Sequence, residues 1–264
     1  MDIDTKVYVQ AKQFLINELE KRGYAESELD KYLISHKKSS LNEIYFSLLS
    51  SSINRGLFLN AISSPLDGTI EPLGDILYSF DHLKVFKKYQ NKKEELLNKI
   101  VNEFDLDVNQ NKKGVWPQFT NSIISGAEFL IQFKDFSDFD NFVEFFHKDE
   151  RARKGLPMLI KEQVDGIGFA LACDFLKEAG YIRFGKPDTW LKQILLKTKL
   201  SDYEDDYRIL KVIERVAKSN NVSEYNVDKI FWLIGSGKFY KTYDAKGKIL
   251  RIGRKLNTFL KETT

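Results

Sequence analysis

The sequence predicts a nearly all-α fold, and three observations support this prediction. Most apolar residues recur at the three- to four-residue spacing of a helix, alternating strand patterns are rare, and we find no repeat of fixed period. A length of 264 residues suits one large domain or two lobes. A hydrophobic fraction of 42% is enough to form a core and excludes a disordered chain.

Composition also excludes several classes of protein. The single cysteine, Cys173, rules out a disulfide framework and any four-cysteine zinc or iron–sulfur site, and the three histidines are too scattered for a transition-metal site. No run of about 18 apolar residues is present, and the first residues lack the pattern of a signal peptide. We therefore expect a protein of the cytoplasm or nucleoid that is not secreted and has no membrane partner.

The predicted helices follow one another along the chain. The first has apolar residues at helical spacing from about Thr5 to Arg22, and Gly23 ends it. A polar loop is expected over 105–114, and Ser201–Glu204 has the pattern of a capping box that opens a helix. Further helices are predicted over Asn42–Ile62, Leu83–Phe104, Trp116–Phe133, Ser137–Phe146 and Asn226–Ile234.

Basic residues are concentrated at the end of the chain, although the net charge is only +3. From Lys238 to Thr264 there are eight basic residues against Asp244 and Glu262. Such a tail favours a polyanionic partner, and a solvated surface helix is the alternative interpretation. The residues that we expect to contact a polyanion are Lys248, Arg251, Arg254 and Lys255.

The most informative stretch is LPMLIKEQVDGIGFALACDFLKEAGYIRFGKPDTWLKQIL, which covers 156–195. A short helix is predicted to end near Gln163, and a second helix runs from about Phe169 to Ala179. A Gly-x-Gly turn between two helices leaves the first amides of the second helix open to a phosphate, although such turns also serve packing alone. The backbone-binding candidates are Gly166, Ile167, Gly168 and Ala170.

With its continuation GKPDTWLKQIL, this stretch resembles the helix-hairpin-helix (HhH-GPD) DNA glycosylases of base-excision repair. In that superfamily a Leu-Pro-Gly-Val-Gly hairpin precedes a helix, a Gly/Pro-rich loop and a catalytic aspartate. Residues 164–168 match the hairpin, with Asp165 where proline is usual, and Asp188 matches the aspartate. Lys192-Gln193 looks like the alkylation-repair branch, and 48–62 and 228–237 look like the family's early and late helices.

The resemblance implies an architecture and a set of ligands. One helical lobe would cover 40–184 and contain the helix-hairpin-helix at about 156–179. The other lobe would combine 1–39 with 185–264. A cleft between the two lobes would take the flipped base, with Asp188 at its mouth. In the family the hairpin carbonyls also hold a monovalent cation, and here Glu162, Val164 and Ile167 would supply them. No other cofactor is implied.

Asp188 carries the implied chemistry. Cleavage of an N-glycosidic bond builds positive charge on the sugar, which a carboxylate stabilises while it orients water. The adjacent Lys186 and Lys192, together with the helix N-terminus, would keep Asp188 ionised. A helix N-cap is the alternative role, and the two roles are compatible.

Bifunctional members carry a nucleophilic lysine two residues after the second hairpin glycine, where this chain has Ala170. The resemblance therefore implies a monofunctional hydrolase. Lys177 and Lys186 lie near in sequence, and we interpret each as a surface charge.

Base flipping requires a side chain that fills the gap in the duplex and a pocket that stacks on the base. By analogy the segment 51–55 would fill the gap, and tryptophan side chains would form the pocket. A tryptophan more often belongs to a core than to such a pocket. The candidates are Ser52, Asn54, Trp116 and Trp190.

The sequence thus predicts a monomeric DNA N-glycosylase that acts on a damaged or modified base, with duplex DNA as its partner. One alternative is an inactive helix-hairpin-helix module that only binds DNA, which the unusual Asp165 and Ala170 keep open. A second alternative is a helical protein-interaction domain, which fits the Phe-rich helices. Neither the target base nor a role in repair or in defence follows from the sequence.

Overall fold

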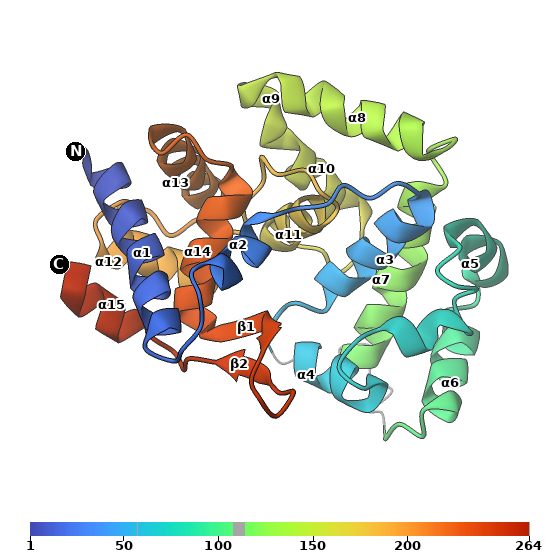
Figure 1. The fold of residues 1–264 in the computed structure, drawn as a ribbon. Coiled ribbons are helices and arrows are strands. Elements are labelled where there is room, and N and C mark those ends of the chain that lie inside the picture. The colour runs from blue at the N-terminus through green and yellow to red at the C-terminus, as the bar shows by residue number, and fades with distance from the viewer. Residues whose placement is uncertain (57, 108–113, 264) are drawn as a thin grey trace. The chain divides into compact units, whose positions relative to one another are not determined.

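The computed structural model describes residues 1–56, 58–107 and 114–263, and within them the predicted all-α class is confirmed (Figure 1). In this part of the chain the strands are β1 (Lys238–Tyr243) and β2 (Ile249–Arg251), which pair antiparallel. No described helix is long and apolar enough to cross a membrane. The loop predicted over 105–114 lies largely outside the described residues.

The chain divides into two compact units, one formed by 1–36 with 180–264 and the other by 37–179. These divisions lie beside the predicted boundaries at 39/40 and 184/185. The predicted helical hairpin falls wholly in the second unit, and Asp188 falls in the first.

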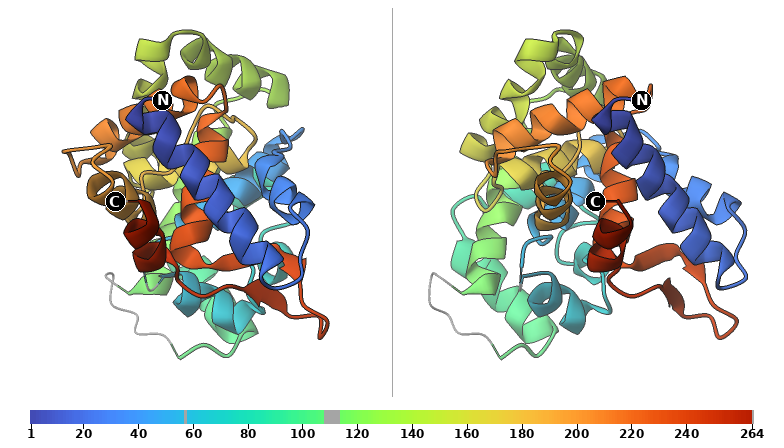
Figure 2. Two further views of the ribbon diagram at one scale, coloured as in Figure 1. Left: turned by 60° about the vertical axis from the view of Figure 1, so that its left-hand side comes forward. Right: turned by 90° about the vertical axis from the view of Figure 1, so that its left-hand side faces the viewer.

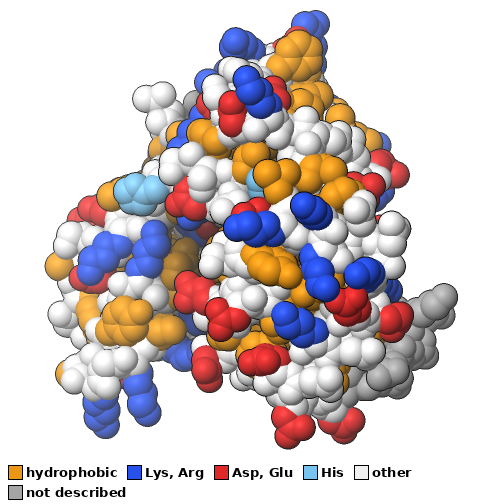
Figure 3. Space-filling view, turned by 90° about the vertical axis from the view of Figure 1, so that its right-hand side faces the viewer, with side chains coloured by type: hydrophobic (Ala, Val, Ile, Leu, Met, Phe, Trp, Pro, Cys, Tyr) orange, Lys and Arg blue, Asp and Glu red, His pale blue; other side chains and the backbone are white. Residues whose placement is uncertain are grey.

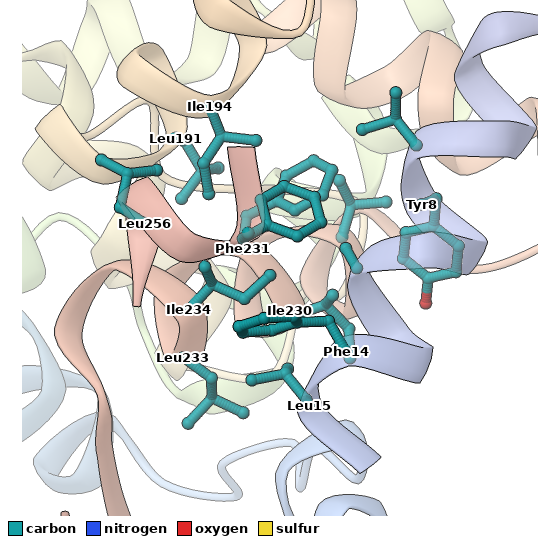
Figure 4. Close-up of a cluster of buried hydrophobic side chains, with 14 of the residues drawn as sticks. Tyr8, Phe14, Leu15, Leu191, Ile194, Ile230, Phe231, Leu233, Ile234 and Leu256 are labelled. Atoms are coloured by element: carbon teal, nitrogen blue, oxygen red, sulfur yellow. The ribbon is translucent and has the colours of Figure 1, made fainter. Parts of the chain in front are cut away.

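The unit formed by 1–36 and 180–264 packs around α14 (Glu224–Ser236). It also contains α1 (Ile3–Glu20), α2 (Ser27–Leu33), α12 (Thr189–Lys197), α13 (Asp206–Ser219), the two strands and α15 (Leu256–Thr263). Figure 4 shows side chains of α1, α12, α14 and α15 gathered in its core: Tyr8, Phe14, Leu15, Leu191, Ile194, Ile230, Phe231, Leu233, Ile234 and Leu256. Burial of this apolar surface stabilises the elements that carry Asp188.

The unit formed by 37–179 packs around α7 (Val115–Leu130), which contacts α3 and α5. A Cβ atom at Gly126 of α7 would lie 2.7 Å from Leu48 Cδ2, so a larger residue there would displace the Leu48 side chain of α3. The other elements are α3 (Leu41–Ser52), α4 (Phe58–Ser63), η1 (Ser64–Leu66), η2 (Glu71–Gly74), α5 (His82–Tyr89), α6 (Lys93–Glu103), α8 (Phe136–Lys148), α9 (Glu150–Arg153), α10 (Gly155–Gln163) and α11 (Phe169–Glu178).

Two of the predicted helices are each divided in the structure. The helix expected over 42–62 becomes α3 and α4, because Gly56 adopts a left-handed φ of 45° that an α-helix does not accommodate. The helix expected over 83–104 becomes α5 and α6, because the backbone of Lys92 is not helical (φ −132°, ψ 43°). Apolar periodicity continues across both breaks and therefore did not reveal them.

The capping box predicted at Ser201–Glu204 is wrong. The Ser201 hydroxyl binds the backbone of Tyr203, and α13 begins later with Asp205 as its N-cap. The interpretation of the basic tail as a single surface helix is also wrong, because its first half forms β1 and β2 and only its end forms α15.

His82 on α5 predicts a pH dependence of stability. Its ring is buried, with Nδ1 3.4 Å from the Asn42 side-chain oxygen, and burial lowers its pKa below 6.5. The unfolded chain therefore takes up a proton before the folded chain does, so stability is complete above about pH 6.5 and falls as the pH drops toward the folded pKa. We expect urea titrations to show this loss between pH 7 and pH 5.

The substitution His82→Gln should flatten this part of the pH profile. The matched control His36→Gln changes an exposed ring and should leave the slope as it is in the unmodified protein. An identical slope for all three proteins would contradict the prediction.

Candidate functional site

The turn of the helical hairpin joins α10 to α11 and is held by α7. The Ser122 hydroxyl donates to the carbonyl of Asp165 (2.7 Å), and the amide of Asp165 donates to the Ser125 hydroxyl (2.9 Å). Both backbone polar groups at the start of the turn are thereby satisfied. The sequence pattern does not indicate these two serines, whose only signal is their spacing of one helical turn on α7.

The two glycines of the turn have different reasons to be glycine. Gly166 has a φ of +78°, and a Cβ there would lie 2.5 Å from Ser122 Oγ, so the fold requires glycine at this position. Gly168 has a φ of −84°, and a Cβ there would have no atom within 4 Å. The fold therefore does not require glycine at position 168. Because Gly168 has no side chain, the space beside the start of α11 is open.

The start of α11 is suited to an anion. Gly168 is its N-cap residue and has no side chain that could accept an amide of this first turn. The first intrahelical bond runs from the amide of Ala172 to the Gly168 carbonyl, so the earlier amides point out of the helix. Ala170 lies in this first turn, half-exposed, with a methyl group as its whole side chain.

The predicted cation site depends on three carbonyls of the helical hairpin. The Val164 carbonyl accepts the amide of Ile167 at 3.2 Å. A carbonyl oxygen has a second lone pair, so this contact leaves Val164 able to act as a ligand beside Glu162 and Ile167. The cation site remains a prediction. Elsewhere in the described ranges no group of three His, Cys, Asp or Glu side chains is placed to hold a metal ion.

Asp188 is the N-cap of α12. Its Oδ1 atom accepts the amides of Trp190 (2.8 Å) and Leu191 (3.0 Å), so the predicted cap role is present. Two amide donors and the positive end of the helix dipole favour the ionised carboxylate. They also fix the direction in which the half-buried carboxylate points.

The loop before Asp188 is held by α13 and α14. A Cβ at Gly185 would lie 2.9 Å from Ile213 Cγ2 and 3.1 Å from the Glu224 carbonyl, so this glycine permits a close approach. The Asp228 carboxylate, 1% exposed, accepts the amide of Lys186 at 3.0 Å. Asp228 therefore positions the loop, a role that its place in the sequence does not reveal.

Two lysines are placed differently from expectation. The Lys192 ammonium pairs with the Asp206 carboxylate, so its charge is directed to α13. Lys177 is not a surface charge, because it is 4% exposed and its ammonium pairs with Asp174 (3.0 Å) and Glu178 (3.3 Å). An ion-paired ammonium is a poor nucleophile.

The gap-filling and pocket candidates divide into different environments. Ser52 is buried, and its hydroxyl donates to the Leu49 carbonyl, which removes it from any surface that DNA could reach. Asn54 is exposed as a residue and donates to the Asp174 carboxylate at 3.0 Å. Trp116 is buried against Phe119.

Trp190 packs beside Gly235, where a Cβ would lie 2.6 Å from the indole, and the Arg254 guanidinium lies over its ring at 5.3 Å. It supports the core of its own unit. Of the basic-tail candidates, Lys255 pairs with Glu18 at 3.3 Å, while Lys248 and Arg251 are exposed beside or on β2.

Arg55 lies beside the helical hairpin and has a more specific environment than the other residues of 51–55. Its guanidinium stacks on Phe58 (3.8 Å) and donates to Gln118 Oε1 (2.8 Å). A Cβ at Gly166 would lie 3.9 Å from its Nη2 atom. Burial lowers its pKa, and its Nε atom is buried without a partner among the described residues. Such an arginine favours the approach of an anion.

Comparison with known proteins gives one informative structural match. No protein-family model matches the chain, and no curated protein does. The fold is similar to the crystal structure of a Methanocaldococcus jannaschii 8-oxoguanine glycosylase/lyase in complex with 15mer DNA containing 8-oxoguanine. The match has a TM-score of 0.53 and 16% identity, and it covers 86% of this chain and 99% of the other. The resemblance to DNA glycosylases that the sequence predicts is therefore confirmed at the level of the fold.

Proposed function

We propose that the protein is a DNA N-glycosylase that hydrolyses the bond between a damaged or modified base and its deoxyribose. The observation that carries this proposal is the oriented carboxylate of Asp188, on a fold shared with a DNA glycosylase/lyase that was crystallised with DNA. The helical hairpin supports it, because it presents an open helix start that suits a phosphate.

In the proposed mechanism Asp188 acts on the sugar. As the bond to the base breaks, positive charge develops on the deoxyribose, and a fixed carboxylate stabilises that charge. Because Oδ1 is held by two amides, the carboxylate needs no reorientation during the reaction. The same group orients the water that attacks the sugar. The helical hairpin holds the DNA backbone and reads no base.

The absence of an amine at position 170 supports the finer proposal of a monofunctional enzyme. The first turn of α11 carries the Ala170 methyl group, which cannot form an imine. Lys177 is paired to two carboxylates. We therefore propose that the product is an abasic site in an intact strand, in contrast with the glycosylase/lyase of similar fold.

A cleavage assay tests the function. The full chain is incubated with duplexes that hold alkylated, oxidised, deaminated or bulky bases, and the strands are separated with and without hot alkali. We expect strand breaks on at least one substrate only after alkali, because an abasic site breaks in alkali and hydrolysis leaves no nick. Breaks without alkali would overturn the monofunctional proposal.

A DNA-binding module without catalysis is the second candidate. Its basis is the departure from the family pattern at Asp165 and Ala170, because the helical hairpin is kept while the nucleophilic lysine is absent. Tight, salt-sensitive DNA binding with no excision of any base would identify this module. An absence of DNA binding at low salt would leave the protein-interaction domain, for which Phe145, 72% exposed on α8, is the structural feature.

A further inference from the structure

The two strands carry a group of basic side chains outside the helical hairpin. We call Lys238, Lys246, Lys248 and Arg251 the strand-pair cluster. Lys238 is half-exposed and the other three are exposed, and none of the four makes an ion pair with a described residue. From Lys238 to Arg254 the chain has six basic residues and one acidic residue, Asp244. Over the face shown in Figure 3, by contrast, basic and acidic side chains are intermixed.

Two members of the cluster are direct cross-strand neighbours. Lys238 pairs in register with Arg251, and the adjacent pair Phe239 and Leu250 is buried. Side chains directly opposite each other on one face of a sheet have Cβ atoms about 4.5–5.5 Å apart, and like charges there are destabilising. Folding alone gives no reason for this arrangement, whereas an anion between the two side chains would remove the repulsion.

The turn that carries the other two members is built rigidly. Asp244 Oδ1 accepts the amides of Lys246 (2.8 Å) and Lys248 (2.9 Å), and the Asp244 amide donates to the Lys248 carbonyl (2.8 Å). Asp244, the only acidic residue from Lys238 to Arg254, therefore hydrogen-bonds to the backbone of the turn and does not pair with the lysines of the cluster. Figure 2 shows this turn extending beyond the helices of its own unit.

The strands are also fixed to their unit. The Tyr32 hydroxyl donates to Thr242 Oγ1 (3.2 Å) and accepts the amide of Lys241 (2.6 Å), and Thr242 donates to Glu28 (2.9 Å). The Lys241 ammonium is directed to the Lys31 carbonyl, so it does not belong to the cluster. A preorganised basic surface loses little conformational entropy when it binds.

We propose that the strand-pair cluster is a second contact surface for the phosphate backbone of duplex DNA, separate from the helical hairpin. The partner is a polyanion because the cluster combines unpaired cations, a like-charged cross-strand pair and a rigid protruding turn. This inference deepens the proposed function, since it rests on DNA as the partner. It assigns the surface to the backbone and not to the base.

Binding of an undamaged duplex at several salt concentrations tests the proposal. Two double variants are used, Lys246→Gln with Lys248→Gln and Lys238→Gln with Arg251→Gln. Each lost phosphate contact lowers the slope of log affinity against log salt by about 0.9, so each pair should lower it by about 2 and weaken binding about tenfold or more at low salt. The control is Lys87→Gln with Lys99→Gln, two exposed lysines on α5 and α6.

Unfolding measurements separate binding from folding. The Lys238→Gln and Arg251→Gln pair should leave the urea midpoint unchanged or raised, because it removes a repulsion. An unchanged salt slope, or the same loss in the control, would overturn the proposal. The proposal would also be overturned if the variants lost binding to phosphatidylserine vesicles while their binding of DNA stayed unchanged.

The outcome is independent of catalysis. Excision is scored on damaged duplexes at protein concentrations that saturate the DNA, so weaker binding does not lower it. If the unmodified protein excises no base but the variants lose salt-dependent DNA binding, the proposed function fails and the strand-pair proposal stands. If the protein excises a base but the variants bind DNA with an unchanged salt slope, the strand-pair proposal fails and the proposed function stands.

Discussion

Asp188→Asn is expected to lower base excision at least about 10²- to 10³-fold, the range for loss of one preorganised electrostatic group. Asparagine keeps an oxygen that accepts the amides of Trp190 and Leu191 but carries no charge to stabilise a cationic sugar. Asparagine and aspartate are similarly good N-caps, so the free energy of unfolding should change by less than about 1 kcal/mol. Single-turnover excision with saturating enzyme is the measurement.

A second variant at the same position separates the cap from the charge. Asp188→Ala removes both, so it should be as inactive as Asp188→Asn and less stable by about 1 kcal/mol. Both proteins should bind undamaged duplex as the unmodified protein does, because Asp188 is not proposed to hold the backbone. Full excision activity in Asp188→Asn would reduce Asp188 to a helix cap and contradict the proposed function.

The helical hairpin and Asp188 were predictable because their signals are local. The glycines stand two residues apart between two helical patterns, and the structure places α10, the turn and α11 within one residue of the predicted bounds. The helix N-cap after Pro187 can likewise be predicted from a few adjacent residues. The fold class follows from periodicity summed over many residues, which tolerates local errors.

The support of these features could not be predicted, because it comes from residues distant in sequence. Ser122 and Ser125 bind a turn about 40 positions away, and Asp228 on α14 accepts the amide of Lys186 in the loop before α12. Nothing near Lys192 indicates that its partner is Asp206. The breaks inside 42–62 and 83–104 depend on single backbone conformations that the apolar pattern does not record.

The conversion of the basic tail into strands has a similar cause. In Lys238–Tyr243 a bulge between Phe239 and Tyr243 disturbs the alternation, so both Phe239 and Thr242 are buried. A search for regular alternation passes over such a strand. The error matters for function, because a helix would have spread the basic residues around its axis, whereas the strands place Lys238 opposite Arg251.

Gly166→Ala should lower the stability of the protein, whereas Gly168→Ala, only two residues away, should lower its affinity for DNA. At Gly166 alanine must adopt a left-handed φ, which costs about 1–2 kcal/mol. Its Cβ also displaces Ser122 Oγ from the Asp165 carbonyl. We expect a loss of about 2–4 kcal/mol in the free energy of unfolding, measured by urea titration. Displacement of Ser122 also removes one of the hydrogen bonds that hold the turn of the helical hairpin to α7.

At Gly168 alanine fits the backbone and meets no atom, and its poorer N-capping is offset by the smaller backbone entropy that alanine loses on folding, so stability should stay within about 1 kcal/mol of the unmodified protein. The new methyl group occupies the space beside the first amides of α11, where the proposal places a DNA phosphate. Affinity for undamaged duplex should therefore fall about tenfold, equivalent to about 1.4 kcal/mol. Unchanged affinity in a stable Gly168→Ala protein would mean that the helical hairpin serves packing alone, because the open space would then have no ligand to admit.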